Sequence, residues 1–268
     1  MIVFPNAKIN IGLNVVSKRC DGYHNIETVF YPLKLYDVLE FVVAEKTELS
    51  VTGIKIDENP DNNLVLKAYR VLKKHFNLPE IKFHLQKNIP FCAGLGGGSS
   101  DAAFTLKALN LFLNLGISEE KLKDYATMAG ADCPFFIENK PAFATETGNK
   151  LTPVNIELAQ YKIVILKPPV EVSTLNAYKN ISPVKPDFNL KNLCNLPVEK
   201  WKETVTNDFE KYVFRVFPVV RELKEKLYEA GALYASMSGS GSAVYGIFSR
   251  LPVNFEKLIP KGILIYQV

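Results

Sequence analysis

Residues 90–103 read PFCAGLGGGSSDAA, and this stretch decides the fold. It holds four of the chain's 15 glycines within five residues, between the alternating segment 81–86 and a helix-forming run from Ser99 to Leu115. At a strand-to-helix junction the free backbone N–H groups and the helix dipole attract anions, and glycine lets a ligand approach the backbone closely. We therefore predict a polyphosphate-binding loop rather than a flexible linker, with the Ser99 and Ser100 hydroxyls donating to phosphate oxygens or ligating Mg²⁺.

Two common nucleotide-binding loops do not fit these residues. A Walker A loop requires a lysine after its last glycine, and no lysine occupies that place. The Rossmann pattern GxGxxG starts at Gly94 and Gly96 but meets Ser99 where its third glycine is required. The residues therefore disfavour both of these nucleotide folds.

The whole chain has the composition of an ordinary globular protein, with 268 residues, 47% of them hydrophobic and 22% charged. A net charge of +4 from scattered residues gives no reason to expect nucleic acid as a partner. No apolar stretch reaches the roughly 18 residues of a membrane span, and the N-terminus lacks a signal-peptide pattern. Four widely spaced cysteines favour a reducing cytoplasm over a zinc site or a disulfide framework. No motif indicates the oligomeric state.

Strand and helix patterns are mixed without a regular βαβ rhythm, so we expect an α+β fold. The alternation from Ala7 to Val16 predicts a strand whose apolar residues face the core, while Lys8, Asn10 and Asn14 face away from it. Other patterns predict a strand over 26–43, helices over 63–76 and 118–130, a hairpin over 142–154 and two helices between about 200 and 230. A seam would divide the chain into domains 1–155 and 156–268.

Three blocks resemble, in order along the chain, the three motifs of the GHMP kinases, a family that includes galactokinase, homoserine kinase and mevalonate kinase. They are PNAKINIGLNV at 5–15, the glycine loop at 90–103 and SMSGSGSAVYGIF at 236–248. Four further blocks resemble the branch of the family that phosphorylates a cytidine diphosphate sugar-alcohol: DGYH at 21–24, GADCPFF at 130–136, STLNAY at 173–178 and NDFE at 207–210.

The resemblance implies a two-domain α+β kinase. Its N-terminal domain would be similar to the second domain of ribosomal protein S5, and its C-terminal domain would be ferredoxin-like. The implied reaction is phosphoryl transfer from ATP, with Mg²⁺, to a hydroxyl of a small molecule. Asp132 would be the base or orienting group for that hydroxyl, and Lys8 would keep the carboxylate ionised. From the residues alone, Asp132 is equally typical of a turn, and a lone lysine such as Lys8 lies most often on a solvated strand face.

The same resemblance implies the substrate-binding residues. Tyr23 and Tyr178 would cover the two faces of the cytosine, and His24 would hydrogen-bond its polar edge. Asn10 would hold the substrate near its transferable oxygen, with Thr174 on the short segment that carries Tyr178.

The implied ATP site is centred on the glycine loop. It would comprise Pro90, Phe91, Cys92, Ala93, Gly94, Leu95, Gly96, Gly97, Gly98, Ser99 and Ser100, together with Lys87 and Asn63. Lys87 is equally typical of a surface lysine before a turn. The sequence does not fix the exact Mg²⁺ ligands.

Other functions on the same fold are another GHMP small-molecule kinase, such as homoserine or mevalonate kinase, and the related diphosphomevalonate decarboxylase. A non-catalytic binding protein is a further alternative. The aromatic set of Tyr23, His24 and Tyr178 favours the cytidine branch, because the other kinases have no use for it.

Overall fold

The computed structural model describes residues 1–54 and 60–268, and the chain forms two compact units. The first unit consists of Met1–Lys8, Pro32–Phe91 and Gly96–Lys140, and the second of Ile9–Tyr31, Cys92–Leu95 and Pro141–Val268. Each unit therefore combines stretches that are distant in the sequence. The domain boundary expected at residue 155 stays a prediction.

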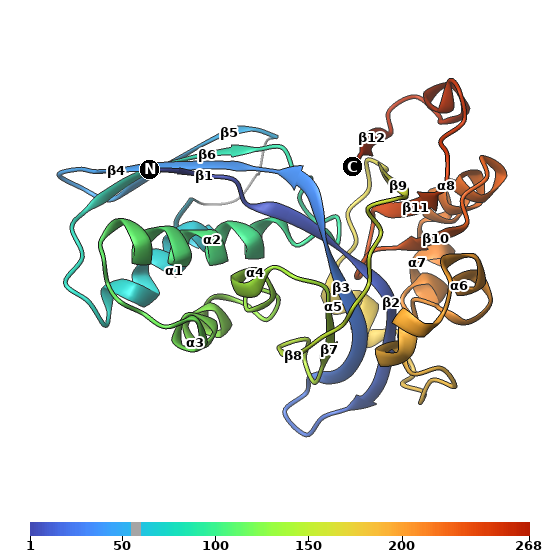
Figure 1. Ribbon diagram of the computed structural model, residues 1–268, viewed down its shortest axis with the longest axis horizontal. Coiled ribbons are helices and arrows are strands. Elements are labelled where there is room, and N and C mark those ends of the chain that lie inside the picture. The colour runs from blue at the N-terminus through green and yellow to red at the C-terminus, as the bar shows by residue number, and fades with distance from the viewer. Residues whose placement is uncertain (55–59) are drawn as a thin grey trace. The chain divides into compact units, whose positions relative to one another are not determined.

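The first unit is a four-stranded sheet with its helices packed on one face (Figure 1). Its strands are β1 (Ile2–Val3), β4 (Val38–Val43), β5 (Glu48–Gly53) and β6 (Ile81–Lys87), in the order β1-β4-β6-β5. The β5–β6 pair is parallel, whereas the β1–β4 and β4–β6 pairs are antiparallel. The helical segments are η1 (Pro60–Asn62), α1 (Leu64–Lys73), α2 (Gly97–Phe112), α3 (Glu119–Ala129) and α4 (Phe135–Glu138).

Helix boundaries in this unit follow the capping residues of the sequence. The Asn63 side chain accepts a hydrogen bond from the Val65 N–H group (2.9 Å) at the start of α1. Ser118 caps α3 in the same way, and Gly130 ends that helix as predicted. The expected helix over 63–76 is confirmed as the slightly shorter α1.

The second unit contains two four-stranded sheets. One has the order β2-β3-β7-β8 and consists of β2 (Asn6–Lys18), β3 (His24–Tyr36), β7 (Ala142–Thr145) and β8 (Lys150–Pro153). Both β2 and β3 have one end in the first unit. The other sheet has the order β10-β11-β9-β12 and consists of β9 (Lys162–Lys167), β10 (Tyr234–Met237), β11 (Val244–Phe248) and β12 (Leu264–Gln267). The predicted hairpin over 142–154 is confirmed as β7 and β8.

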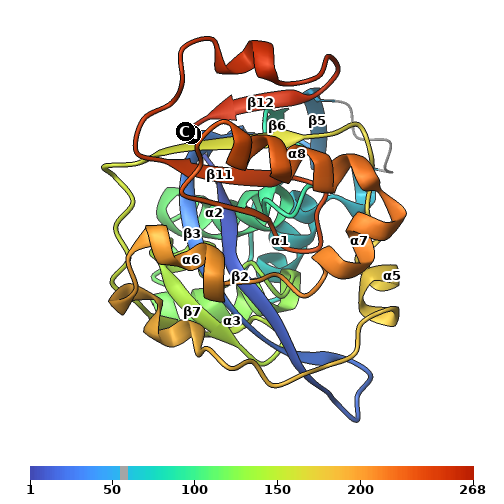
Figure 2. The same cartoon turned by 90° about the vertical axis from the view of Figure 1, so that its right-hand side faces the viewer.

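Helices cover the sheet that contains β11, and α8 lies across it in Figure 2. The helical segments of this unit are α5 (Thr174–Lys179), η2 (Leu190–Asn195), α6 (Val198–Thr204), α7 (Glu210–Val216), α8 (Pro218–Glu229) and η3 (Phe255–Leu258). The core between helices and sheet is apolar, with Val213, Leu223 and Leu227 of the helices packed among buried residues that include Val164 and Val244.

Three expectations from the sequence are corrected. The single strand expected over 26–43 is two strands, β3 and β4, interrupted at the buried Asp37. Three helices rather than two lie between 198 and 229, because the chain turns after Thr204 and Pro218 starts a new helix. The polar face of β2 is buried as well: Lys8, Asn10 and Asn14 are each at most 5% exposed.

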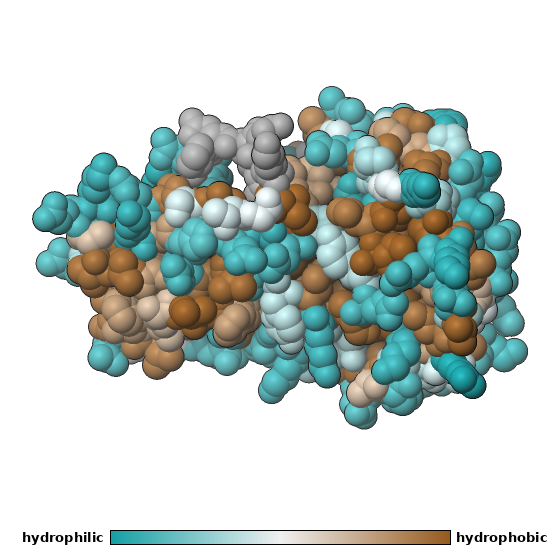
Figure 3. Space-filling model, turned by 90° about the horizontal axis from the view of Figure 1, so that it is seen from above, coloured by the Kyte–Doolittle hydropathy of each residue, from teal (hydrophilic) through white to brown (hydrophobic). Residues whose placement is uncertain are grey.

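The outer face of the first unit's sheet carries hydrophilic and hydrophobic side chains side by side (Figure 3). On β6, Lys82, His84 and Gln86 alternate with buried residues. In the part of the chain that the structure describes, no helix is both long and apolar enough to cross a membrane.

Candidate active site

The glycine loop ends at the N-terminus of α2, and helix N-termini are places where backbone N–H groups can hold an anion. Gly96 is the N-cap residue and has a φ of 71°, in the left-handed region that glycine adopts without strain. Because Gly96 has no side chain, it leaves the first-turn N–H groups uncapped and available to a ligand. The helix dipole adds partial positive charge at the same place. The helix starts at Gly97, two residues earlier than predicted.

Lys8 and Asp132 form an ion pair within the first unit. The Lys8 Nζ atom is 3.3 Å from Asp132 Oδ2; the Lys8 side chain is 4% exposed and that of Asp132 is 35% exposed. Burial lowers the pKa of Lys8, and the Asp132 carboxylate opposes this shift. The pair thus combines a buried cation with a carboxylate that remains open to a substrate.

The Lys8 side chain also packs against the glycine loop. A Cβ atom built on Gly96 would lie only 3.0 Å from Lys8 Cε and 2.9 Å from the Phe136 ring. The alkyl stem of Lys8 therefore lies directly beneath the N-cap of α2. This packing brings the ion pair and the start of the helix, both predicted as functional, into one local arrangement.

Asp132 lies in the turn between α3 and α4. Next to it, the Cys133 thiol is buried, and burial raises its pKa to about 12, so this thiol is not a nucleophile near neutral pH.

Lys87 and Asn63, both predicted at the nucleotide site, have protein partners of their own. The Lys87 ammonium pairs with Asp37 and, at 2.7 Å, with Asp101. The Asn63 side-chain oxygen caps α1. Lys87 is 3% exposed, which excludes the interpretation as a surface lysine.

In the second unit, Asn10 is fixed by hydrogen bonds on several sides. Its N–H group donates to Ser238 Oγ (3.1 Å), its side-chain amide donates to Thr28 Oγ1 (3.0 Å), and its carbonyl accepts from the Tyr245 hydroxyl (2.9 Å). Ser238 in turn donates to the carbonyl of Gly94 in the glycine loop (2.8 Å). The third motif thus supports both Asn10 and the first half of the glycine loop.

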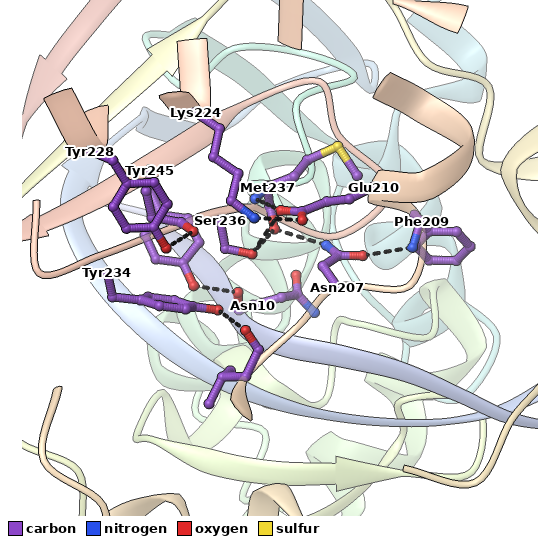
Figure 4. A network of polar contacts seen from close by, with 12 residues as sticks. Asn10, Asn207, Phe209, Glu210, Lys224, Tyr228, Tyr234, Ser236, Met237 and Tyr245 are labelled. Carbon is purple, nitrogen blue, oxygen red and sulfur yellow. Dashed lines mark hydrogen bonds and ion pairs between the residues drawn. The ribbon is translucent and has the colours of Figure 1, made fainter. Parts of the chain in front are cut away.

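A buried polar network surrounds the start of the third motif (Figure 4). Asn207 donates to the carbonyls of Met237 and Gly239, each at 2.8 Å. Glu210 accepts from the Met237 N–H group (2.9 Å) and pairs with Lys224 (2.6 Å). These bonds hold the ends of the loop that carries Ser238.

The residues predicted to bind cytosine also lie in the second unit. The His24 and Tyr178 rings stack with their centroids 5.0 Å apart and an interplanar angle of 20°. Tyr23 is 66% exposed, and the Thr174 hydroxyl is 2.7 Å from that of Ser240. Burial, followed by the charge of Lys18, lowers the pKa of His24. The ring therefore stays neutral to a lower pH than an ordinary histidine.

Sequence reasoning missed the residues that hold these groups in place, chiefly Asp37, Asp101, Asn207 and Tyr245. A signal existed for two of them. Asp37 interrupts an otherwise apolar strand pattern, and Asn207 starts the NDFE block. The other two lie inside strong helix and strand patterns, where nothing marks them as special.

The fold, the glycine loop and the ion pair together define a class of small-molecule kinase, and the chain belongs to the GHMP kinase family. The family's N-terminal domain model matches residues 63–140 and its C-terminal domain model matches residues 189–255. Proteins named 4-diphosphocytidyl-2-C-methyl-D-erythritol kinase are close relatives. The one from Parabacteroides distasonis is 53% identical over 96% of this chain and 94% of its own length. The one from Bacteroides fragilis is 53% identical over 93% and 92%.

Solved structures show the same relationship. A crystal structure of 4-(cytidine 5'-diphospho)-2C-methyl-D-erythritol kinase matches with a TM-score of 0.79 and 31% identity, over 92% of this chain and 90% of that one. The Methanococcus jannaschii mevalonate kinase shares the fold, with a TM-score of 0.71 and 15% identity over 100% and 97% of the two chains. The predicted two-domain GHMP kinase fold is therefore confirmed.

Proposed function

We propose that the protein phosphorylates the 2-hydroxyl of 4-diphosphocytidyl-2-C-methyl-D-erythritol with ATP, in the non-mevalonate route to isoprenoid precursors. The products are the 2-phosphate and ADP. One observation supports this proposal most directly: the Lys8–Asp132 pair lies against the N-cap of α2, with the two charged groups 3.3 Å apart. A carboxylate and an ammonium at the end of a phosphate-binding loop are the groups that phosphoryl transfer to a hydroxyl requires. The names of the curated relatives support the choice of substrate.

In the proposed reaction the 2-hydroxyl oxygen attacks the γ-phosphorus of ATP. The bond between the γ-phosphorus and the bridging oxygen of the β-phosphate breaks, and ADP leaves with the two electrons of that bond. The hydroxyl proton passes to Asp132. Lys8 pairs with Asp132 and offsets negative charge that develops on the transferred group.

ATP is bound by the main chain of Pro90–Ser100, with Asn63 and Lys87 contributing on the nucleotide side. Among the described residues no three His, Cys, Asp or Glu side chains form a cluster that could hold a metal ion. This fits Mg²⁺, which keeps several waters and is bound largely through substrate phosphates. We propose that the ion enters with ATP, where it neutralises phosphate charge.

The substrate is recognised by Asn10, Tyr23, His24, Thr174 and Tyr178. Because His24 already stacks on Tyr178, an aromatic surface is formed before the cytosine arrives. Flat ring faces provide stacking area, and the polar edge of the base is read by hydrogen bonds. We further propose a cytoplasmic location, since all four cysteines are free thiols.

The test is an ADP-release assay with the purified chain, ATP, Mg²⁺ and the cytidyl substrate. We expect turnover with this substrate, and none with homoserine or mevalonate. Carbon dioxide release from diphosphomevalonate would instead indicate the decarboxylase. The Asp132→Asn variant should lose turnover and still bind ATP and substrate. Near-normal turnover of that variant would remove Asp132 from the mechanism.

A further inference from the structure

A buried cluster of three charges lies within the first unit. Lys87, the last residue of β6, pairs with Asp37, which lies between β3 and β4, and with Asp101 in the first turns of α2. All three side chains are at most 3% exposed. With one ammonium and two carboxylates, the ionised cluster carries a net negative charge at a buried place.

The cluster is directly connected to the glycine loop. Asp37 Oδ1 accepts hydrogen bonds from the N–H groups of Asn88 (2.6 Å) and Ile89 (2.9 Å), which lead the chain into the loop. A Cβ atom built on Gly97 would lie 3.2 Å from Lys87 Nζ, so the ammonium lies beneath the first residue of α2. The three charges are therefore placed under the turn of backbone that would receive phosphate.

Asp101 is the member of the cluster whose charge is least well compensated. Its Oδ1 atom is buried without a hydrogen-bond partner among the described residues, and so is the hydroxyl of its neighbour Ser100. Burial raises the pKa of Asp101 to about 7; Lys87 opposes the shift and Asp37 adds to it. For Lys87, burial acts to lower the pKa, but the two carboxylates outweigh it and the pKa is raised. Lys87 thus keeps its proton, and Asp101 gains one at a higher pH than an ordinary aspartate does.

Given the proposed ATP site, we infer that Lys87 acts from beneath the loop as a positioning residue, and that the Asp37–Lys87–Asp101 cluster takes up a proton when phosphate binds at the start of α2. The physical reason is repulsion between like charges. A phosphate above the first turn disfavours the ionised form of a carboxylate below it. Lys87 cannot relieve this repulsion, because its charge is already shared by two carboxylates.

The sign of the pH dependence follows from this repulsion. Bound phosphate raises the pKa of Asp101 above its free value of about 7. Below that value Asp101 is already protonated and nucleotide binds without proton uptake. As the pH rises from about 7 to the bound pKa, binding requires a proton and affinity falls. Each unit of pKa shift corresponds to about a tenfold loss of affinity across this window.

The experiment is titration calorimetry with ADP in two buffers of different ionisation enthalpy, at a pH slightly above the free pKa of Asp101. The difference in heat between buffers gives the number of protons taken up. We compare the unchanged protein with Asp101→Asn, which keeps the side-chain shape, and with Asp124→Asn, the same change on the exposed surface of α3. The titration of ADP itself is common to all three proteins and cancels.

We expect the unchanged protein and Asp124→Asn to take up more protons than Asp101→Asn, and the loss of ADP affinity with rising pH to be weaker in Asp101→Asn. Equal uptake in all three proteins would overturn the inference and leave the proposed function intact. Failure of the unchanged protein to bind ADP would refute the proposed function itself. If Asp101→Asn does not fold, Asp37→Asn replaces it, since it also reduces the cluster by one negative charge.

Lys87→Met tests the positioning role by steady-state kinetics. We expect a raised KM for ATP, an unchanged KM for the acceptor, and partial rescue by Lys87→Arg. A rise in both KM values together would contradict a role confined to the nucleotide loop.

Discussion

Replacing Gly94 by alanine is the sharpest test of how the glycine loop is built. Gly94 has a φ of 73°, and a Cβ atom placed there would lie 1.9 Å from the carbonyl oxygen of Ser238. Real Cβ atoms do not approach other atoms closer than 3.0 Å, so the two segments must separate by about 1.1 Å, the difference between 3.0 and 1.9. The neighbouring atom is backbone, which cannot rotate away as a flexible side chain would.

The expected loss of stability has two parts. An L-residue in the left-handed region costs roughly 1–2 kcal/mol. Overpacking against fixed neighbours costs roughly 1–3 kcal/mol more. The sum is roughly 2–5 kcal/mol, and the hydrogen bond from Ser238 Oγ to the Gly94 carbonyl is strained or lost with it. At about 2–4 °C per kcal/mol, the melting temperature should fall by roughly 4–20 °C.

Gly98→Ala is the matched control, because it is the same substitution four residues further along the same loop. Its Cβ atom would meet only Leu64 Cδ1, at 3.4 Å, and its φ is not in the left-handed region. Alanine is also favoured over glycine within a helix by about 1 kcal/mol. Thermal or urea unfolding without nucleotide should therefore show Gly98→Ala at least as stable as the unchanged protein. Equal melting temperatures for the two variants would refute this account of the loop.

Three further experiments, two with substitutions and one with pH, test other parts of the structure. Tyr245→Phe removes the 2.9 Å hydrogen bond to the Asn10 carbonyl and should lower the free energy of unfolding by about 1–3 kcal/mol. We expect a raised KM for the cytidyl substrate and an unchanged KM for ATP. In the pH profile of kcat, activity should fall on the alkaline side at a pH below the ordinary lysine pKa of about 10.4. The reason is that burial lowers the pKa of Lys8, so its ammonium loses the proton earlier as the pH rises. A fall at or above that value would contradict a catalytic role for the Lys8 ammonium. Leu227→Ala in the core beneath α8 should cost about 2–5 kcal/mol in urea unfolding, whereas Leu258→Ala, at a position 50% exposed, should cost far less.

Much of the fold could be predicted because its signals are local. The capping residues Asn63 and Ser118, and the turn between β7 and β8, act over a few positions and are visible in any window of sequence. The motifs that carry Lys8 and Asp132 are also contiguous, so the family could be recognised before the structure was known. Their proximity in space, by contrast, is a property of the folded unit alone.

The contacts of the supporting residues could not be predicted, even where the sequence marks the residue itself, because their partners are distant in the sequence. Asp37 lies 50 residues from Lys87, and Asn207 lies 30 residues from Met237. One signal was nevertheless present. On β6 the buried positions are Ile81, Phe83, Leu85 and then Lys87, so the strand period itself places this lysine on the core side. A charged residue in a core position indicates a buried partner, since an unpaired buried charge is too unstable.

The concentration of glycines in residues 90–103 has a cause inside the protein as well as the proposed ligand outside it. A side chain at Gly94 would meet the Ser238 carbonyl, one at Gly96 would meet Lys8, and one at Gly97 would meet Ile89 and Lys87. Two of these neighbours are the buried lysines Lys8 and Lys87, both of which are paired with carboxylates. To bring a lysine close beneath a main-chain turn, the turn must lack Cβ atoms. Glycine is therefore needed at positions 96 and 97 so that the Lys8 and Lys87 side chains can pack against the main chain. Because these residues have no side chains, their N–H groups also remain open to the proposed phosphate on the other side of the turn.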